Sequence, residues 1–229
     1  MKFNSILSLR YATFVMFLVI IPQRASSQQL IGFGVHVDPL VGWFTSDNSN
    51  ITGKGATSGF NFGLTFNKYF YENYAFSMGL SLITAGGSFS CSDTAVLKLK
   101  KPIEVLPGGK SIYKIKYLAI PVGLKLRSNQ IGYISIFTDI GLDPKFILGG
   151  KVEIPSQNIV KENADNMLNR LSMGYHIIGG IEYSLGGTTS LVLGLNFDSN
   201  FTNVIKNDNH QPSVKILHKM LGLHLGFNF

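Results

Sequence analysis

The feature that most constrains the fold of this chain is the strict two-residue alternation of its last ten residues, 220–229. Leucine or phenylalanine occupies every second position, and methionine, glycine, histidine or asparagine occupies the positions between. Successive side chains of a strand point to opposite faces, so this pattern predicts a strand between two unlike environments. An apolar row that ends in phenylalanine is typical of a lipid-facing barrel strand. A half-buried strand of a soluble protein would show the same alternation.

Seven further segments repeat the alternation, and the sequence therefore predicts eight strands in one β domain. Their connections alternate between long polar loops and short turns, among them the two-residue hairpin signal Gly186-Gly187. An even strand number with short turns at one end and long loops at the other indicates an all-β, antiparallel, up-and-down transmembrane barrel. Short turns would then be periplasmic and long loops extracellular. The expected strands are 30–44, 58–68, one beginning at 74, then 113–127, 131–148, 171–185, 189–201 and the closing strand.

Residues 1–27 have the organisation of a secretory signal peptide. Lys2 and Arg10 provide the positive region, 11–21 provide a short apolar region, and Ala25-Ser26-Ser27 provides small residues for cleavage. We therefore expect residues 28–229 to form the barrel domain. Loss of the peptide lowers the formal charge from +7 to +4, because it removes three basic residues and no acid. The basicity is consequently a weak argument for nucleic-acid binding.

Composition excludes two other classes of exported protein. No long uninterrupted apolar run follows residue 27, which excludes a helical membrane protein. Cys91 is the only cysteine, so an internal disulfide framework is impossible. At 45% hydrophobic and 14% charged residues the chain is apolar for a soluble exported domain and suits a barrel whose outer face meets lipid.

Aromatic residues are expected at both rims of this barrel. Most gather near the predicted short turns, where an interfacial girdle belongs, and Trp43 and Phe44 lie toward the other rim.

Polar residues of the inward-facing rows are the candidate site. Lys125, Asp139 and Glu182 are expected to approach one another in the half of the lumen near the short turns. We interpret them as a paired-charge network that fills a lumen too narrow for a water channel. The chain contains no motif for a nucleophile, metal or phosphate site, and we expect no cofactor.

A second candidate surface lies in the long segment 86–112, which is expected to project beyond the bilayer as a hairpin with its turn at Pro107-Gly108-Gly109. Its Lys98, Lys100 and Lys101 could contact acidic lipopolysaccharide or the acidic face of a partner protein.

The stretch YLAIPVGLKL (117–126), with Ile131-Gly132-Tyr133, Gly180-Ile181-Glu182-Tyr183 and the closing LGLHLGFNF, resembles the PorT-like outer-membrane β-barrel family. The similarity extends over most of the expected mature chain. Ala119 departs from the family pattern, since members often carry an acidic residue there. The resemblance implies an outer-membrane barrel, a terminal phenylalanine recognised by the barrel-insertion machinery, and a link to type IX protein secretion and gliding.

These observations predict a non-enzymatic barrel of a Gram-negative-type outer membrane, which contacts lipid and lipopolysaccharide and whose loops meet partner proteins. Two alternatives remain open. A small lipid-modifying enzyme on the same barrel would need clustered Ser, His and Asp at the strand ends. A soluble lipocalin-like barrel would need its large apolar side chains inside.

Overall fold

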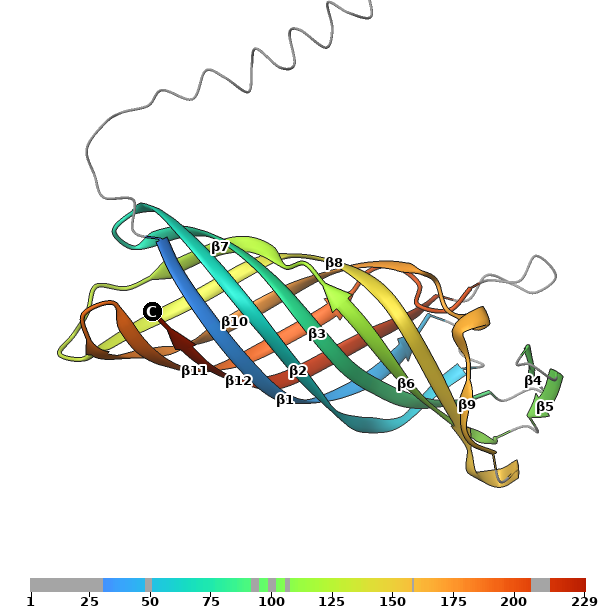
Figure 1. Cartoon of the computed structure of the whole chain (residues 1–229). Coiled ribbons are helices and arrows are strands. Elements are labelled where there is room, and N and C mark those ends of the chain that lie inside the picture. The colour runs from blue at the N-terminus through green and yellow to red at the C-terminus, as the bar shows by residue number, and fades with distance from the viewer. Residues whose placement is uncertain are drawn as a thin grey trace, which may run out of the picture.

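The computed structural model describes residues 31–47, 51–91, 95–98, 102–105, 108–157, 159–206 and 215–229, except for the side chains of 51, 91, 95–98, 102–105, 159 and 160. These residues form a closed antiparallel barrel whose strands are tilted about a long axis (Figure 1). No helix among them is long and apolar enough to cross a membrane.

The wall of the barrel consists of eight strands, one of which is interrupted. Each pairs antiparallel with its neighbour, and pairing of the first strand with the last closes the ring. The predicted eight-stranded up-and-down barrel is confirmed. The wall strands are β1 (Ile31–Ser46), β2 (Ile51–Tyr71), β3 (Tyr74–Cys91), β6 (Lys110–Ala119) followed by β7 (Val122–Arg127), β8 (Ile134–Ile154), β10 (Leu171–Gly186), β11 (Thr189–Asn200) and β12 (Ile216–Asn228).

The predicted strand 113–127 is divided into β6 and β7 by Ile120-Pro121. Proline has no backbone N–H and cannot donate to a ladder. The backbone nevertheless stays bonded there, because the N–H of Ile120 donates to the carbonyl of Pro144 and the N–H of Gly79 donates to that of Pro121, both at 2.9 Å. Both halves lie between β3 and β8, so they count as one wall strand.

The two ends of the barrel carry different connections. At one end, tight turns join β2 to β3 and β10 to β11. In the second turn Gly186 and Gly187 have φ of 108° and 61°, values that favour glycine, and the predicted hairpin signal is confirmed. The opposite end carries the hairpin of β4 (Ala95–Lys98) and β5 (Pro102–Val105), the short strand β9 (Ile159–Asn163), and the 3-10 turns Pro155–Gln157 and Asp165–Met167 (Figure 1).

The expectation for segment 86–112 was partly wrong. A hairpin does project there, but β3 continues to Cys91 and β6 begins at Lys110, so much of the segment is wall. Strands β4 and β5 pair with Lys98 opposite Pro102, so Pro107-Gly108-Gly109, which follows β5, is not the turn of this hairpin.

Alternation assigns the two faces of the wall as predicted. Every wall strand exposes apolar side chains on its outer face, for example Phe33, Phe62, Leu80, Leu124, Ile140, Ile177, Leu193 and Leu223. The soluble lipocalin-like alternative is therefore wrong, because it needs the large apolar side chains inside.

Toward the long-loop end the two faces of the wall exchange their chemistry: the outer face becomes charged and the inner face becomes apolar. Along β6, Lys114 and Lys116 point outward, whereas Ile115 and Tyr117 are fully buried inside. Farther along the same wall strand, Leu124 and Leu126 point outward and Lys125 points inward. The reversal indicates where the wall leaves lipid for water, since only there is a charged outer face favourable.

Candidate functional site

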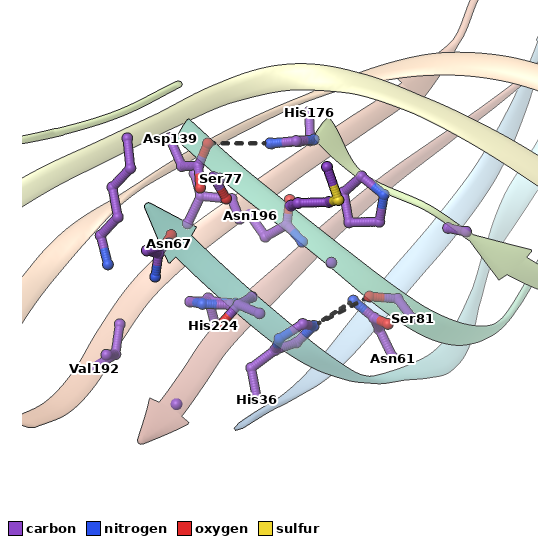
Figure 2. A pocket seen from close by; sticks show the side chains of 18 of the residues that line it. His36, Asn61, Asn67, Ser77, Ser81, Asp139, His176, Val192, Asn196 and His224 are labelled. Atoms are coloured by element: carbon purple, nitrogen blue, oxygen red, sulfur yellow. Dashed lines mark hydrogen bonds and ion pairs between the residues drawn. The ribbon is translucent and has the colours of Figure 1, made fainter. Parts of the chain in front are cut away.

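The lumen is divided into a polar half near the short turns and an apolar half near the long loops. The polar half contains a cavity of about 60 Å³ (Figure 2). A water molecule needs about 10–15 Å³ of such volume, so the cavity has room for only a few waters. We call it the lumen chamber; its lining includes His36, Asn61, Asn67, Ser77, Ser81, Asp139, His176, Val192, Asn196 and His224.

Asp38 organises one side of the polar half. It lies on β1 and is fully buried. One carboxylate oxygen lies 2.8 Å from Nδ1 of His224 on β12. The other accepts hydrogen bonds of 3.0 Å from the side-chain amides of Asn61 on β2 and Asn196 on β11. A buried carboxylate requires such partners, and Asp38 thereby ties four strands together.

His176 of β10 organises the opposite side through two carboxylates of β8. Its Nδ1 lies 2.7 Å from Asp143 and its Nε2 lies 3.5 Å from Asp139. Asp139 is also the register partner of Lys125 across the β7–β8 ladder.

Lys125 and Glu182 meet closer to the short turns. Their Nζ and Oε1 atoms are 2.5 Å apart, and both side chains are buried. Glu182 also accepts a 3.1 Å hydrogen bond from Asn228 and lies 3.6 Å from the guanidinium of Arg127. Of the three residues predicted to form a network, Lys125 and Glu182 are thus in direct contact. Asp139 has His176 as its ion-pair partner.

A buried cluster around Lys145 was not predicted. The Lys145 ammonium contacts Asp198 of β11, donates a 2.8 Å hydrogen bond to Asn200 and lies 3.9 Å from Asp143. Two-residue counting from Asp139 would have placed Asp143 and Lys145 on the inner face. Pro144 between them obscured that signal.

The other half of the lumen is filled by an apolar cluster, which was also not predicted. Phe44 belongs to it and is buried in the lumen, not placed at the outer rim as expected; its ring centroid lies 6.1 Å from that of Phe89 and 6.4 Å from that of Tyr113. His218 is buried beside this cluster, with Nδ1 2.8 Å from the Tyr117 hydroxyl and Nε2 3.2 Å from the carbonyl of Gly86. Other members are Leu40, Ile83, Ala85, Ile115, Tyr117, Ala119, Val152, Ile154, Ala164, Leu168, Val204, Ile216 and Met220.

Within the part of the chain that the structure describes, Ser81 and His36 come nearest to a nucleophile and its base. The serine Oγ lies 3.5 Å from Nε2 of His36 (Figure 2). A base of this kind needs a third group on its other nitrogen. Nδ1 of His36 is buried without a hydrogen-bond partner, and Asp38 bonds His224 instead.

Several amide oxygens give the chamber the character of a hydration site. The side-chain oxygens of Asn61, Asn67 and Asn196 accept no hydrogen bond from protein. They line the chamber, where a water molecule could donate to them. Among the described residues no three His, Cys, Asp or Glu side chains are grouped to hold a metal ion.

The predicted loop lysines are only partly within the described structure. Lys98 ends β4, and its side chain is not described. Lys100 and Lys101 lie outside the described residues.

Comparisons with known proteins give the family of the chain. Residues 23–206 match the family model for the outer membrane protein beta-barrel domain. No curated protein matches the sequence.

Solved structures of similar architecture are outer membrane proteins. Neisserial surface protein A is 12% identical, with a TM-score of 0.49 over 86% of this chain and 95% of that protein. A major outer membrane protein of Thermus thermophilus is 12% identical (TM-score 0.48, 87% and 100% covered), and OprG of Pseudomonas aeruginosa is 11% identical (TM-score 0.47, 88% and 97% covered). The family match covers most of the chain: this protein belongs to the outer membrane protein beta-barrel domain family and lies in the outer membrane as a multi-pass barrel.

Proposed function

We propose that this protein is a non-enzymatic, non-conducting component of the outer membrane, which acts through its outer wall and its long-loop end. The observation that carries the proposal is the apolar cluster across the lumen. Tyr113, Ile115, Val152 and Ile154 are fully buried there, so an ion would meet hydrocarbon and aromatic rings along its path. Transfer of an ion into such surroundings is very unfavourable.

The polar half supports the same proposal. Its charged side chains are bound to one another, as with Lys125 and Glu182 or Lys145 and Asp198. These paired side chains therefore occupy the lumen and hold the strands in register. A small barrel requires its interior to be filled by side chains.

The lipid-modifying enzyme is less well supported. Ser81 and His36 lie inside the lumen, both with buried side chains, and not at a rim where a lipid headgroup could reach them. The chamber of about 60 Å³ is also far smaller than the pockets of several hundred Å³ that hold typical ligands.

A link to type IX secretion is a finer proposal that rests on the PorT-like resemblance of residues 117–126. This stretch spans the break between β6 and β7. Deletion of the gene should then impair secretion of type IX cargo, with the plasmid-borne gene as control. Normal cargo secretion in the deletion strain would remove this proposal.

Conductance measurement tests the principal proposal. Purified protein, shown to be folded by its heat-modifiable electrophoretic mobility, is inserted into planar lipid bilayers beside an open porin as positive control. We expect no steady single-channel current from this protein. A steady conductance from the folded protein, or lipid hydrolysis that disappears in His36→Gln, would contradict the proposal.

A further inference from the structure

We propose that Lys114, Lys116 and Lys151 form a binding surface for the phosphate groups of lipopolysaccharide in the outer leaflet. We call these three residues the rim lysines. This inference rests on the location of the barrel in the outer membrane. It does not depend on whether the lumen is sealed. All three side chains are exposed on the outer face of the wall, two from β6 and one from β8.

Their height on the wall is the first argument. The continuous outer apolar rows of β3, β6 and β8 end at Leu82, Leu118 and Leu148, and Leu82 is the register partner of Leu118. Beyond the lysines of β6, only the half-buried Ile112 is apolar on this face. The next outward row carries Thr84 opposite Lys116. The rim lysines therefore begin where the hydrocarbon contact ends, at the depth of lipid phosphates, and their aliphatic stems can lie along the apolar band.

Charge is the second argument. Lys114 and Lys151 are register partners in the β6–β8 ladder, so two ammonium groups project side by side from the same face. Like charges directly opposite each other destabilise a sheet. Among the described residues no carboxylate lies within ion-pair distance of a rim lysine, although Glu153 is on the same face of β8. A bound dianionic phosphate would relieve this repulsion.

Access to the rim lysines is the third argument. Two of the three have a glycine across one ladder: Gly86 is opposite Lys114, and Gly149 is opposite Lys116. Lys151 has Asn163 of β9 opposite it, and the Asp165 carboxylate lies beside Gly149. A phosphate can therefore approach the ammonium groups of Lys114 and Lys116 over these glycines, where neither β3 nor β8 places a bulky side chain.

Binding of defined lipids tests the proposal. Native mass spectrometry of the folded protein in detergent compares retention of bisphosphorylated lipid A with that of the fully dephosphorylated lipid. We expect the natural protein to retain the bisphosphorylated form preferentially. In Lys114→Gln/Lys116→Gln/Lys151→Gln each lysine removed should weaken this binding about fivefold.

The matched control is Lys54→Gln/Lys206→Gln/Lys215→Gln, which removes the same charge from exposed positions of the long-loop end outside the rim lysines. It should retain the lipid as the natural protein does. Equal losses in both triple variants would reduce the effect to net charge and overturn the proposal. Equal retention of the two lipids by the natural protein would also overturn it, because the apolar wall alone would then account for binding. Neither result depends on whether the lumen conducts.

Discussion

At the scale of single residues, the lumen depends on ion pairs that link neighbouring strands. Lys125 is 5% exposed and Glu182 is 4% exposed, and the cation also lies 4.9 Å from the centroid of the Phe137 ring. Removal of one member of a buried pair leaves the other charge without its partner, which costs more than the pair itself contributes.

Glu182→Leu should therefore lower the free energy of unfolding by about 3–5 kcal/mol, because the Lys125 ammonium would remain buried and unpaired. Urea titration of the protein folded in lipid vesicles measures this change. The matched control is Lys125→Met/Glu182→Leu, which removes both charges and should be clearly more stable than the single variant. A double variant as unstable as Glu182→Leu would show that the pair does not account for the loss.

The sequence predicts well which residues face the lumen. It predicts less well which of those residues contact one another. Two-residue counting correctly put Lys125, Asp139 and Glu182 inside, since parity along a strand is a local property. The contact between Lys125 and Glu182 joins residues 57 positions apart. It depends on the register of β7, β8 and β10 together, which alternation alone does not determine.

At the scale of strands, the exchange of apolar and charged faces along β6 explains why residues 86–112 were expected to project beyond the bilayer as a hairpin. A strand with apolar outward-facing and polar inward-facing residues is recognised only as far as the wall contacts lipid. Beyond that level the inner face is apolar and the outer face is charged. Buried Phe89 and Tyr113 belong to wall that continues beyond that level. An apolar cluster thus replaces lipid contact as the source of stability for these strand ends.

Substitution on β12 tests the depth of the lipid-facing band. Leu223 is 41% exposed on the outer face, opposite Leu195 of β11. Leu223→Arg should destabilise the folded barrel by about 2–4 kcal/mol, since the guanidinium would be placed near the middle of the bilayer. The same urea titration in vesicles provides the measurement.

Thr52→Arg serves as the control for this substitution. Thr52 is exposed on β2 near the long-loop end, where the wall meets water. Its replacement should change stability little. If both arginine variants were equally stable, the assigned lipid-facing band would be misplaced.

At the scale of the whole molecule, we predict that the barrel is inserted with its long loops outside the cell, as is usual for barrels of this kind. Exposed Lys54 lies toward the long-loop end of β2 and exposed Lys68 lies toward its short-turn end. In a Cys91→Ser background, Lys54→Cys should react in intact cells with a membrane-impermeant maleimide, because it faces the medium.

Lys68→Cys should react only after the outer membrane is permeabilised. Labelling of both variants after permeabilisation is the control for thiol accessibility. Reaction of Lys68→Cys but not Lys54→Cys in intact cells would mean that the barrel is inserted the other way round.

The apolar cluster across the lumen has a consequence for the cell that makes this protein. Outer membranes keep out bile salts and many antibiotics, and each open pore weakens that protection. Under our proposal, a barrel occluded by Phe44, Tyr113 and their neighbours opens no such route. On this proposal, additional copies of the protein would add lipid-facing wall to the membrane without adding pores.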